Sequence, residues 1–414
     1  MIRMFALFSR KWEARRAYLW LTAAQSAAFA LIFTVDMVYQ VQVVGLTPLQ
    51  LVLVGTTLEV TIFLFEVPTG VVADVYSRRL SILIGLALIG LGFILQGAIP
   101  TFAAVLAAQL LWGIGYTFTS GATQAWITDE VGESQVGPVF LRGSQIGNLV
   151  GIAASVVAIG IGSAILNLPI LLGGALFIVL AAGLVLVMPE QHFHPRPTSE
   201  RSSWHQMSDT LRAGLRLVRG RRILLAILGI GLFYGLYSEG LDRLNTKHLL
   251  ESFTLPEVGG LQPVVWIGAI GLIGQFLSAG VLRLTEKRLD MTTGRPLARA
   301  LLGVNVVLVG GLIGFALAGS FVMAVLFRWL ITISRALIEP VYATWINQHI
   351  DSSVRATVIS MSSQVDAFGQ MVGGPPVGVF GERFGIRAAL AASAAILSPV
   401  VALTAVILRR GTQP

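Results

Sequence analysis

Hydrophobic residues form long runs along this chain, and short polar or charged segments separate the runs. A helix needs about 20 mostly apolar residues to cross the hydrocarbon core of a bilayer. By that length, the pattern predicts twelve transmembrane helices in two sets of six. They lie near 17–44, 49–72, 80–98, 102–125, 138–162, 169–188, 222–248, 262–284, 297–318, 321–346, 356–380 and 387–408.

The composition changes this picture from a soluble chain to a membrane chain. Hydrophobic residues make up 55% of the sequence and charged residues 12%, against about 25% charged in a typical globular protein. Backbone polar groups within a bilayer must be satisfied inside the protein, and long apolar runs do so as helices. We therefore expect an all-α polytopic membrane protein. With no cysteine in the chain, disulfides and thiolate chemistry are excluded.

The positive charges predict the orientation. Most of the 29 Lys and Arg fall at the two termini and in every second loop, while Arg243, Lys247, Arg383 and Arg387 lie on the opposite side. Lys and Arg accumulate in cytoplasmic loops, so both termini should be cytoplasmic. The net charge of +8 then needs no nucleic acid partner. We expect a multi-pass protein of a plasma membrane, of the bacterial inner-membrane type, with an uncleaved first span.

The only long polar stretch, 189–221, separates the two sets of spans. Arginines recur in it at helical spacing beside several leucines, which predicts an amphipathic helix on the inner membrane surface. His192, His194 and His205 lie in this linker, but no carboxylate completes a ligand spacing. We interpret them as solvated loop residues and expect no metal and no cofactor.

An internal repeat supports two related halves. A shift of 219 positions maps Trp126 and Ile127 onto Trp345 and Ile346, and maps Ser144-Gln145 onto Ser363-Gln364. Two parallel halves related by an axis along the membrane normal are typical of transporters. We therefore predict an N-terminal bundle at 1–188, a linker at 189–221 and a C-terminal bundle at 222–414.

The segment between the second and third spans, 66–79, carries the most specific motif. It reads E-V-P-T-G-V-V-A-D-V-Y-S-R-R, and Pro68 and Gly70 interrupt its helical pattern. Its end resembles the major facilitator superfamily motif G-x-x-x-D-R-x-G-R-R, with Val75 in place of an Arg and Ser77 in place of a Gly. The resemblance implies the fold of that superfamily, two pseudo-symmetric six-helix bundles.

The same resemblance implies a conformational latch between the halves. Gly70 would permit a close approach of helices, and Asp74 would face the positive N-terminus of a neighbouring helix. Arg78 and Arg79 would pair with acids at the end of the fourth span. The expected latch residues are Glu66, Gly70, Asp74, Arg78, Arg79, Asp129 and Glu130.

Ionisable residues also lie within the predicted spans, where each costs about 2.5–3.5 kcal/mol and should face a partner or a cavity. Glu239 with Arg243 and Arg335 with Glu339 are each four apart, which predicts ion pairs along one helix. Three acids lack an obvious local partner, and such burial favours the protonated form that a proton carrier needs. The full set is Asp36, Glu59, Glu239, Asp242, Arg243, Arg328, Arg335, Glu339 and Asp366, of which Asp36, Glu59 and Asp366 are the acids without a partner.

Aromatic side chains accompany these charges. An apolar pocket with few polar groups suits amphiphilic organic cations or neutral drugs. Among the aromatic residues of the spans, Tyr116, Phe233 and Tyr237 have polar neighbours on their own helix faces. We predict that these three line the substrate cavity.

These features favour a secondary active transporter of the drug-efflux-like branch, a monomer that exports small amphiphilic compounds by proton antiport with alternating access. Two alternatives stay open: a proton symporter that imports a polar metabolite or organic anion, and a receptor or lipid-moving protein that transports no solute. We do not expect an enzyme. No phosphate-binding G-x-x-x-x-G-K-[ST] loop is present, so energy should come from an ion gradient or from the substrate's own gradient.

Overall fold

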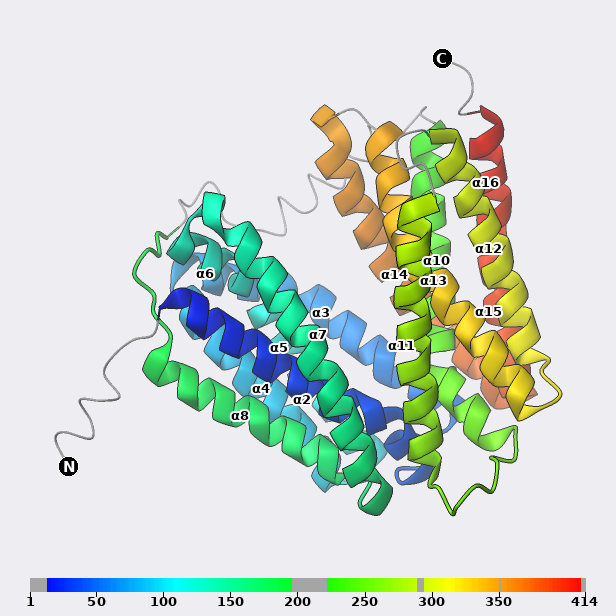
Figure 1. Ribbon diagram of the computed structural model, residues 1–414, viewed down its shortest axis with the longest axis horizontal. Helices are drawn as coiled ribbons and strands as arrows, with labels where there is room; N and C mark the ends of the chain where they lie inside the picture. Colours follow the sequence, from blue (N-terminus) through cyan, green and yellow to red (C-terminus); the bar gives the residue numbers. More distant parts are fainter. Residues whose placement is uncertain (1–12, 196–221, 289–293, 350–351, 411–414) are drawn as a thin grey trace. The chain divides into compact units, whose positions relative to one another are not determined.

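The computed structural model describes residues 13–195, 222–288, 294–349 and 352–410, and within these ranges the regular structure is entirely helical. Figure 1 shows the helices in chain order. Their bounds are α2 Ala14–Gln42, α3 Pro48–Val75, α4 Arg78–Ala98, α5 Phe102–Thr119, α6 Ala122–Val131, α7 Glu133–Ala164, α8 Leu168–Val187, α10 Arg222–Glu251, α11 Pro263–Arg288, α12 Gly294–Ala316, α13 Phe321–His349, α14 Ser352–Phe384, α15 Ile386–Leu397 and α16 Pro399–Arg410. The amphipathic helix predicted in the linker and His205 lie outside the described residues.

Two predicted spans are each divided into two helices. The fourth breaks between α5 and α6, where Gly121 has a φ of 69°, a left-handed conformation that glycine adopts at little cost. The last breaks between α15 and α16 at Ser398, directly before Pro399. Proline cannot donate the backbone hydrogen bond that would continue the helix.

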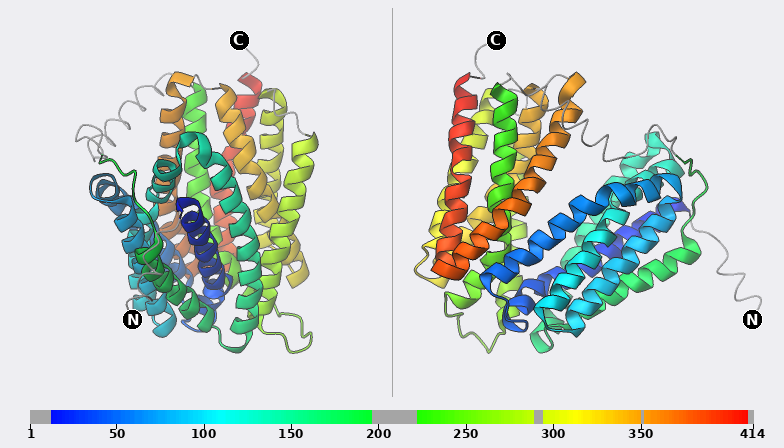
Figure 2. Two further views of the ribbon diagram at one scale, coloured as in Figure 1. Left: turned by 60° about the vertical axis from the view of Figure 1, so that its left-hand side comes forward. Right: turned by 180° about the vertical axis from the view of Figure 1, so that it is seen from behind.

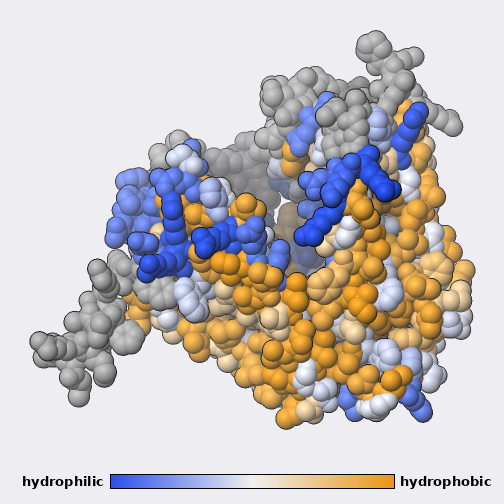
Figure 3. Space-filling view, in the orientation of Figure 1, coloured by the Kyte–Doolittle hydropathy of each residue, from blue (hydrophilic) through white to orange (hydrophobic). Residues whose placement is uncertain are grey.

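Eleven stretches of the described chain are long and apolar enough to cross a membrane. They cover the predicted spans except the eleventh, whose helix, α14, is 33 residues long but carries Asp366, Glu382 and two prolines. Over unit 2, defined below, the visible flank is largely hydrophobic, with hydrophilic residues gathered toward the helix ends (Figure 3). The predicted class, an all-α polytopic membrane protein, is confirmed.

The segment 66–79 is helical over most of its length, which corrects our expectation of an interrupted helix. α3 continues through Pro68 to Val75, and α4 begins after Tyr76 and Ser77. The hydroxyl of Thr69 donates to the carbonyl of Phe65 at 2.8 Å, one turn back along the helix. Pro68 therefore removes one hydrogen bond without ending the helix, as neighbouring groups of a transmembrane helix allow.

The chain divides into two compact units. Unit 1 comprises Met1–Gly45 and Thr57–Met207, and unit 2 comprises Leu46–Thr56 and Ser208–Pro414. The first nine residues of α3 thus belong to unit 2 and the rest of α3 to unit 1. Within unit 2, Lys247 Nζ donates to the carbonyl of Leu46 at 2.9 Å. The linker aside, these units differ from the predicted bundles in the assignment of residues 46–56.

In unit 1, α4 packs between α5 and α8 (Figure 2). Its contacts on both sides are close because glycines face each other. A Cβ on Gly85 would lie 2.5 Å from the carbonyl oxygen of Gly115, and one on Gly90 would lie 2.7 Å from that of Gly174. Small residues of this kind let helix backbones touch in membrane proteins.

Replacing Gly174 by Ala is expected to destabilise unit 1. The new Cβ would lie 2.8 Å from the carbonyl oxygen of Gly90, so the helices must separate, at a cost of about 1–3 kcal/mol. Thermal unfolding of the purified protein would measure the loss. Gly183→Ala on the same helix is the control, because a Cβ there meets nothing within 4 Å and alanine favours helix. Equal melting temperatures for the two variants would contradict the prediction.

Unit 2 repeats the helix packing of unit 1, and its later helices begin in the same register as their counterparts in unit 1. A shift of 219 residues maps the first residues of α5 and α7, Phe102 and Glu133, onto the first residues of α13 and α14, Phe321 and Ser352. Trp126 and Trp345, equivalent under this shift, are both fully buried. The internal repeat seen in the sequence therefore corresponds to equivalent helices.

Candidate functional site

In unit 1, Asp36 lies in a buried polar cluster rather than alone. Its side chain is 4% exposed, and its two carboxylate oxygens accept hydrogen bonds from two amides, Gln40 Nε2 at 2.9 Å and Gln96 Nε2. Gln109 Nε2 in turn donates to Gln96 Oε1 at 3.3 Å. Three helices, α2, α4 and α5, therefore contribute to one chain of amides that ends on Asp36, which corrects the expectation that this acid lacks a partner.

This arrangement suits an acid that changes its protonation state. Two N–H donors stabilise the ionised carboxylate. The protonated form would need an acceptor instead, and the oxygens of Gln40 and Gln109 are buried without a hydrogen-bond partner. Rotation of an amide exchanges its donor and acceptor, so the Gln40 side chain can serve either state of Asp36.

An aromatic cluster lies on the same helices. Phe29 and Phe33 of α2 stack with ring centroids 5.3 Å apart, and Trp112 of α5 lies 5.2 Å from Phe33. Phe93 and Phe177 pack on the edges of this group. Phe33 is 43% exposed, and the indole N–H of Trp112 is buried without a partner. Phe33 is therefore the exposed edge of a cluster whose Phe93 and Phe177 rings are packed inside the unit.

In unit 2, an ion pair joins α10 to α13. The two terminal nitrogens of the Arg335 guanidinium, Nη1 and Nη2, donate to the carboxylate of Asp242, the second at 2.9 Å. The guanidinium carbon also lies 6.0 Å from the centroid of the Tyr237 ring, in cation–π geometry. We had expected Arg335 to pair with Glu339 on its own helix; its partner is Asp242 instead.

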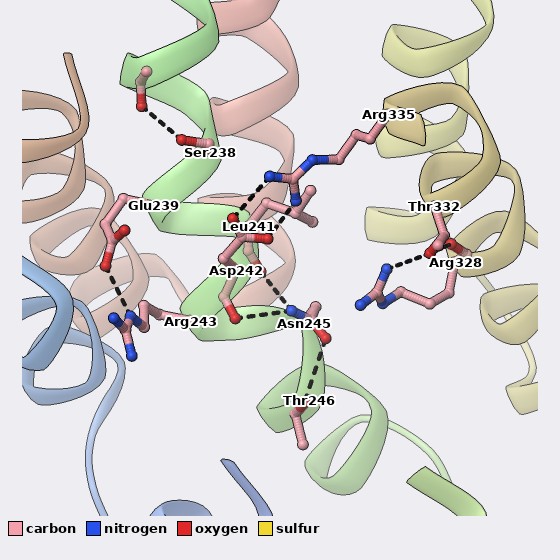
Figure 4. A network of polar contacts seen from close by, with 11 residues as sticks. Ser238, Glu239, Leu241, Asp242, Arg243, Asn245, Thr246, Arg328, Thr332 and Arg335 are labelled. Atoms are coloured by element: carbon pink, nitrogen blue, oxygen red, sulfur yellow. Dashed lines mark hydrogen bonds and ion pairs between the residues drawn. The ribbon is translucent and has the colours of Figure 1, made fainter. Parts of the chain in front are cut away.

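Two further charged residues belong to this part of unit 2. Arg328 of α13 donates from Nη1 to the hydroxyl of Thr332 at 2.7 Å. Asp366 of α14 accepts from Gln370 Nε2 at 2.9 Å and interacts electrostatically with Arg335. Figure 4 shows Arg328 and Arg335 extending from α13 toward the helix that carries Asp242.

The predicted pair of Glu239 and Arg243 is present and occupies another side of α10. Arg243 Nε donates to Glu239 Oε1 at 2.8 Å, and both side chains point away from Arg335 (Figure 4). Gly55, in the first part of α3, packs directly against these two side chains. This ion pair is therefore separate from the group formed by Asp242 and Arg335.

The segment 66–79 forms a third polar cluster, inside unit 1. Arg78 is 7% exposed, forms an ion pair with Asp129 of α6 and donates to the carbonyl of Ala125 at 2.9 Å. Its guanidinium also lies 5.9 Å from the Phe193 ring. Arg78 thus ties the start of α4 to α6 and to the chain that follows α8.

Arg79 and Glu130 do not pair with each other, although we had expected acids of the fourth span to neutralise both arginines. Arg79 donates to the carbonyl of Val185. Glu130 Oε1 instead accepts from the backbone of Gln191 at 2.6 Å and of His192 at 2.9 Å. Glu130 therefore holds the first residues of the linker.

Ser77 and Glu190 cap the N-terminus of α4, a role that we had considered for Asp74. Ser77 Oγ accepts from the backbone of Leu80 at 2.9 Å and donates to Glu190 Oε2 at 2.6 Å. Glu190 Oε1 accepts from the backbone of Arg79 at 2.9 Å. An acceptor at this position satisfies N–H groups that have no partner in the helix. The serine that departs from the family motif is thus a helix cap.

Six further predicted residues lie on α3, α5, α10 and α13. The close helix approach expected at Gly70 is not present among the described residues, since a Cβ there would meet nothing within 4 Å. Glu59 is half-buried on α3 and Glu66, on the same helix, is exposed. Tyr116 on α5 is 44% exposed, Phe233 on α10 is half-buried, and Glu339 on α13 is exposed.

Several residues of these clusters escaped the sequence analysis. Gln96, Gln109, Thr332 and Glu190 were not predicted as site residues. The signal for the two glutamines was available, because each is a polar amide inside a long apolar run. An amide within a span requires a hydrogen-bonding partner as a charge does.

Comparison with known proteins agrees with this fold. The family model described as "Major Facilitator Superfamily" matches residues 17–365. An uncharacterised MFS-type transporter of Bacillus subtilis (strain 168), YxaM, is 22% identical over 369 residues, which cover 86% of this chain and 87% of YxaM. The chain belongs to the major facilitator superfamily and is a membrane transporter of that type.

Solved structures show the same fold at low sequence identity. The nucleoside transporter NupG matches with a TM-score of 0.72 and 15% identity, covering 97% of this chain and 100% of NupG. The peptide transporter POT in complex with sulfate matches with a TM-score of 0.73 and 12% identity, covering 96% of this chain and 94% of POT. At such identities the similarity establishes the fold alone.

Proposed function

We propose that this transporter exports small amphiphilic organic compounds in exchange for protons. The observation that carries the proposal is the position of Asp36, an acid buried among amides that can hydrogen-bond both of its protonation states. An ionisable residue inside a membrane domain is costly and marks a proton or ion pathway by default. Asp36 would take up the proton that drives export.

The aromatic cluster of α2, α4, α5 and α8 would supply the apolar contact surface for the cargo. Phe33 and Asp36 are three residues apart, so the cluster and the acid share one side of α2. An aromatic cluster with an exposed ring, that of Phe33, would accept flat apolar molecules without demanding one hydrogen-bonding pattern. Such a surface suits a transporter of chemically varied amphiphiles.

The conformational latch predicted at 66–79 stays part of the proposal, with its partners now named. Arg78, Asp129 and the linker residue Phe193 form one group in unit 1. We propose that this group holds the ends of α4 and α6 and the start of the linker together during one stage of the transport cycle. In the orientation inferred from the positive charges, this group and both termini face the cytoplasm.

Reconstitution into liposomes tests the proposed function. Vesicles with an imposed pH gradient would be supplied with a panel of fluorescent amphiphilic dyes, and vesicles with a sodium gradient would serve as the comparison. We expect dye movement against the proton flow, abolished by a protonophore and absent with sodium alone. Movement in the same direction as the protons would establish symport instead. Lipid scrambling without solute movement would replace both with a lipid-moving function.

A further inference from the structure

Of the three arginines Arg243, Arg328 and Arg335, Arg328 differs from the other two in its charge balance. Arg243 pairs with Glu239 and Arg335 pairs with Asp242. Arg328 is half-buried, and its contact within the described chain is a neutral one, the hydroxyl of Thr332 at 2.7 Å. Arg328 interacts electrostatically with Asp242 and Arg335, but both carboxylate oxygens of Asp242 already accept hydrogen bonds from Arg335.

The position of Arg328 makes this imbalance costly. It is the eighth residue of α13, about 10 Å along the axis from the start of that helix at 1.5 Å per residue. A guanidinium at such a depth faces the protein interior and requires an acceptor. An arginine has five N–H donors, and the hydroxyl of Thr332 receives one of them.

The side chain is nevertheless held in place. Thr332 lies one turn beyond Arg328 on the same helix, and its hydroxyl donates to the backbone carbonyl of Arg328 at 2.9 Å while accepting from the guanidinium. Figure 4 shows the guanidinium directed toward the space beside Asp242 and Asn245 of α10. Fixing a guanidinium before its ligand arrives reduces the entropy lost on binding.

We propose that Arg328 binds an anionic oxygen group, a carboxylate, sulfonate or phosphate, carried by the transported compound. Arginine presents parallel N–H groups that match such anions in a two-point contact. With Asp366 neutral and one ligand anion bound, two arginines would face two negative groups, Asp242 and the ligand. This assignment rests on the proposed function and names its substrate class, amphiphiles with an acidic head group.

Asp366 gives the site a second adjustable charge. It is hydrogen-bonded to Gln370 and interacts with Arg335. While Asp366 is ionised, its negative charge opposes an incoming anion, and its neutralisation favours binding. Removing the negative charge at position 366 should therefore strengthen anion binding, whereas removing the positive charge at position 328 should weaken it.

Equilibrium binding to the purified full-length protein in nanodiscs tests the site without any gradient. The probes are 2-naphthoate, 2-naphthalenesulfonate and 2-naphthyl phosphate, with neutral 2-naphthamide as the matched isostere, and the readout is the shift in melting temperature with ligand concentration. We expect at least one anion to bind ten-fold or more tighter than the amide. Comparison of the three anions identifies the preferred head group.

Variants separate this assignment from general apolar binding. Arg328→Gln should weaken the anion at least ten-fold and leave the amide unchanged, Arg328→Lys should weaken it less, and Asp366→Asn should tighten it. If Arg328→Gln fails to fold, Arg328→Lys and Thr332→Val carry the test, each with a weakened anion and an unchanged amide. Equal binding of anions and amide by the native protein, or unchanged anion binding in the Arg328 variants, would overturn the proposal. Neither result would decide whether the protein exports compounds in exchange for protons, because the liposome assay with a pH gradient tests that function separately.

Discussion

Asp36→Asn is expected to lower the rate of dye export driven by a pH gradient about 100-fold or more, while exchange of dye for dye continues. Asparagine keeps the size of the side chain, and the Gln40 amide, whose oxygen has no partner, can rotate to accept its N–H. The cluster should therefore stay packed although it can no longer gain or lose a proton. Proteoliposome transport with and without the gradient measures both activities.

Glu286→Gln is the matched control for this change. It makes the same exchange of a carboxylate for an amide, at an exposed position of α11, and should leave both activities unchanged. Gradient-driven export that survives in Asp36→Asn with its pH dependence intact would remove the coupling role from Asp36. Loss of both exchange and gradient-driven export would indicate a damaged fold and would equally contradict the prediction.

Arg78→Gln is expected to destabilise unit 1 by about 3 kcal/mol. The side chains of Arg78 and Asp129 are 8% and 29% exposed, and removing one partner of a buried pair costs about 3–5 kcal/mol because the other charge is left behind. We expect a loss at the lower end of this range because the Asp129 side chain remains partly exposed to solvent. Thermal unfolding gives the loss, and transport rates report whether the conformational balance has changed as well.

The neighbouring arginine provides the control. Arg79 donates to a single carbonyl, that of Val185, so Arg79→Gln should cost much less. The double variant Arg78→Gln with Asp129→Asn should recover part of the stability, because no buried charge is left unpaired. Equal losses for the two arginine variants, or a double variant no more stable than Arg78→Gln, would show that the ion pair contributes little.

The helices were predictable from the sequence because each span must be apolar for the length of a bilayer. The predicted span 169–188 corresponds to α8, Leu168–Val187, and the predicted span 80–98 corresponds to α4, Arg78–Ala98. Prediction was wrong at Pro68, where α3 continues. The proline was expected to interrupt the helical pattern inside the predicted span 49–72, although a transmembrane helix tolerates the loss of one backbone hydrogen bond.

The partners of the charged residues were less predictable. The pair of Glu239 and Arg243 follows from a spacing of four along one helix. The pairing of Arg335 with Asp242 joins α13 to α10 across 93 residues, and no periodicity within either helix encodes that contact. The same spacing rule favoured Glu339, so a local rule gave the wrong partner where a tertiary contact was available.

The same limit applies to Asp36. Its neighbour Gln40 lies one turn away and was visible on the same helical face, whereas Gln96 comes from another helix, 60 residues later. Gln96 and Gln109 meet because α4 and α5 pack closely enough for glycines to be required between them. Such packing depends on how helices are arranged in three dimensions, which hydrophobic patterns do not determine.

The glycine contacts of α4 also have a mechanical consequence. Where backbone lies directly on backbone, as between Gly85 and Gly115 and between Gly90 and Gly174, the paired glycines have no side chain of their own that could change rotamer and absorb a displacement. The helices α5, α4 and α8 should therefore move as one rigid group. Asp36 is hydrogen-bonded to this rigid group through Gln96. A displacement of Gln96 caused by protonation of Asp36 would therefore move all three helices together along their length.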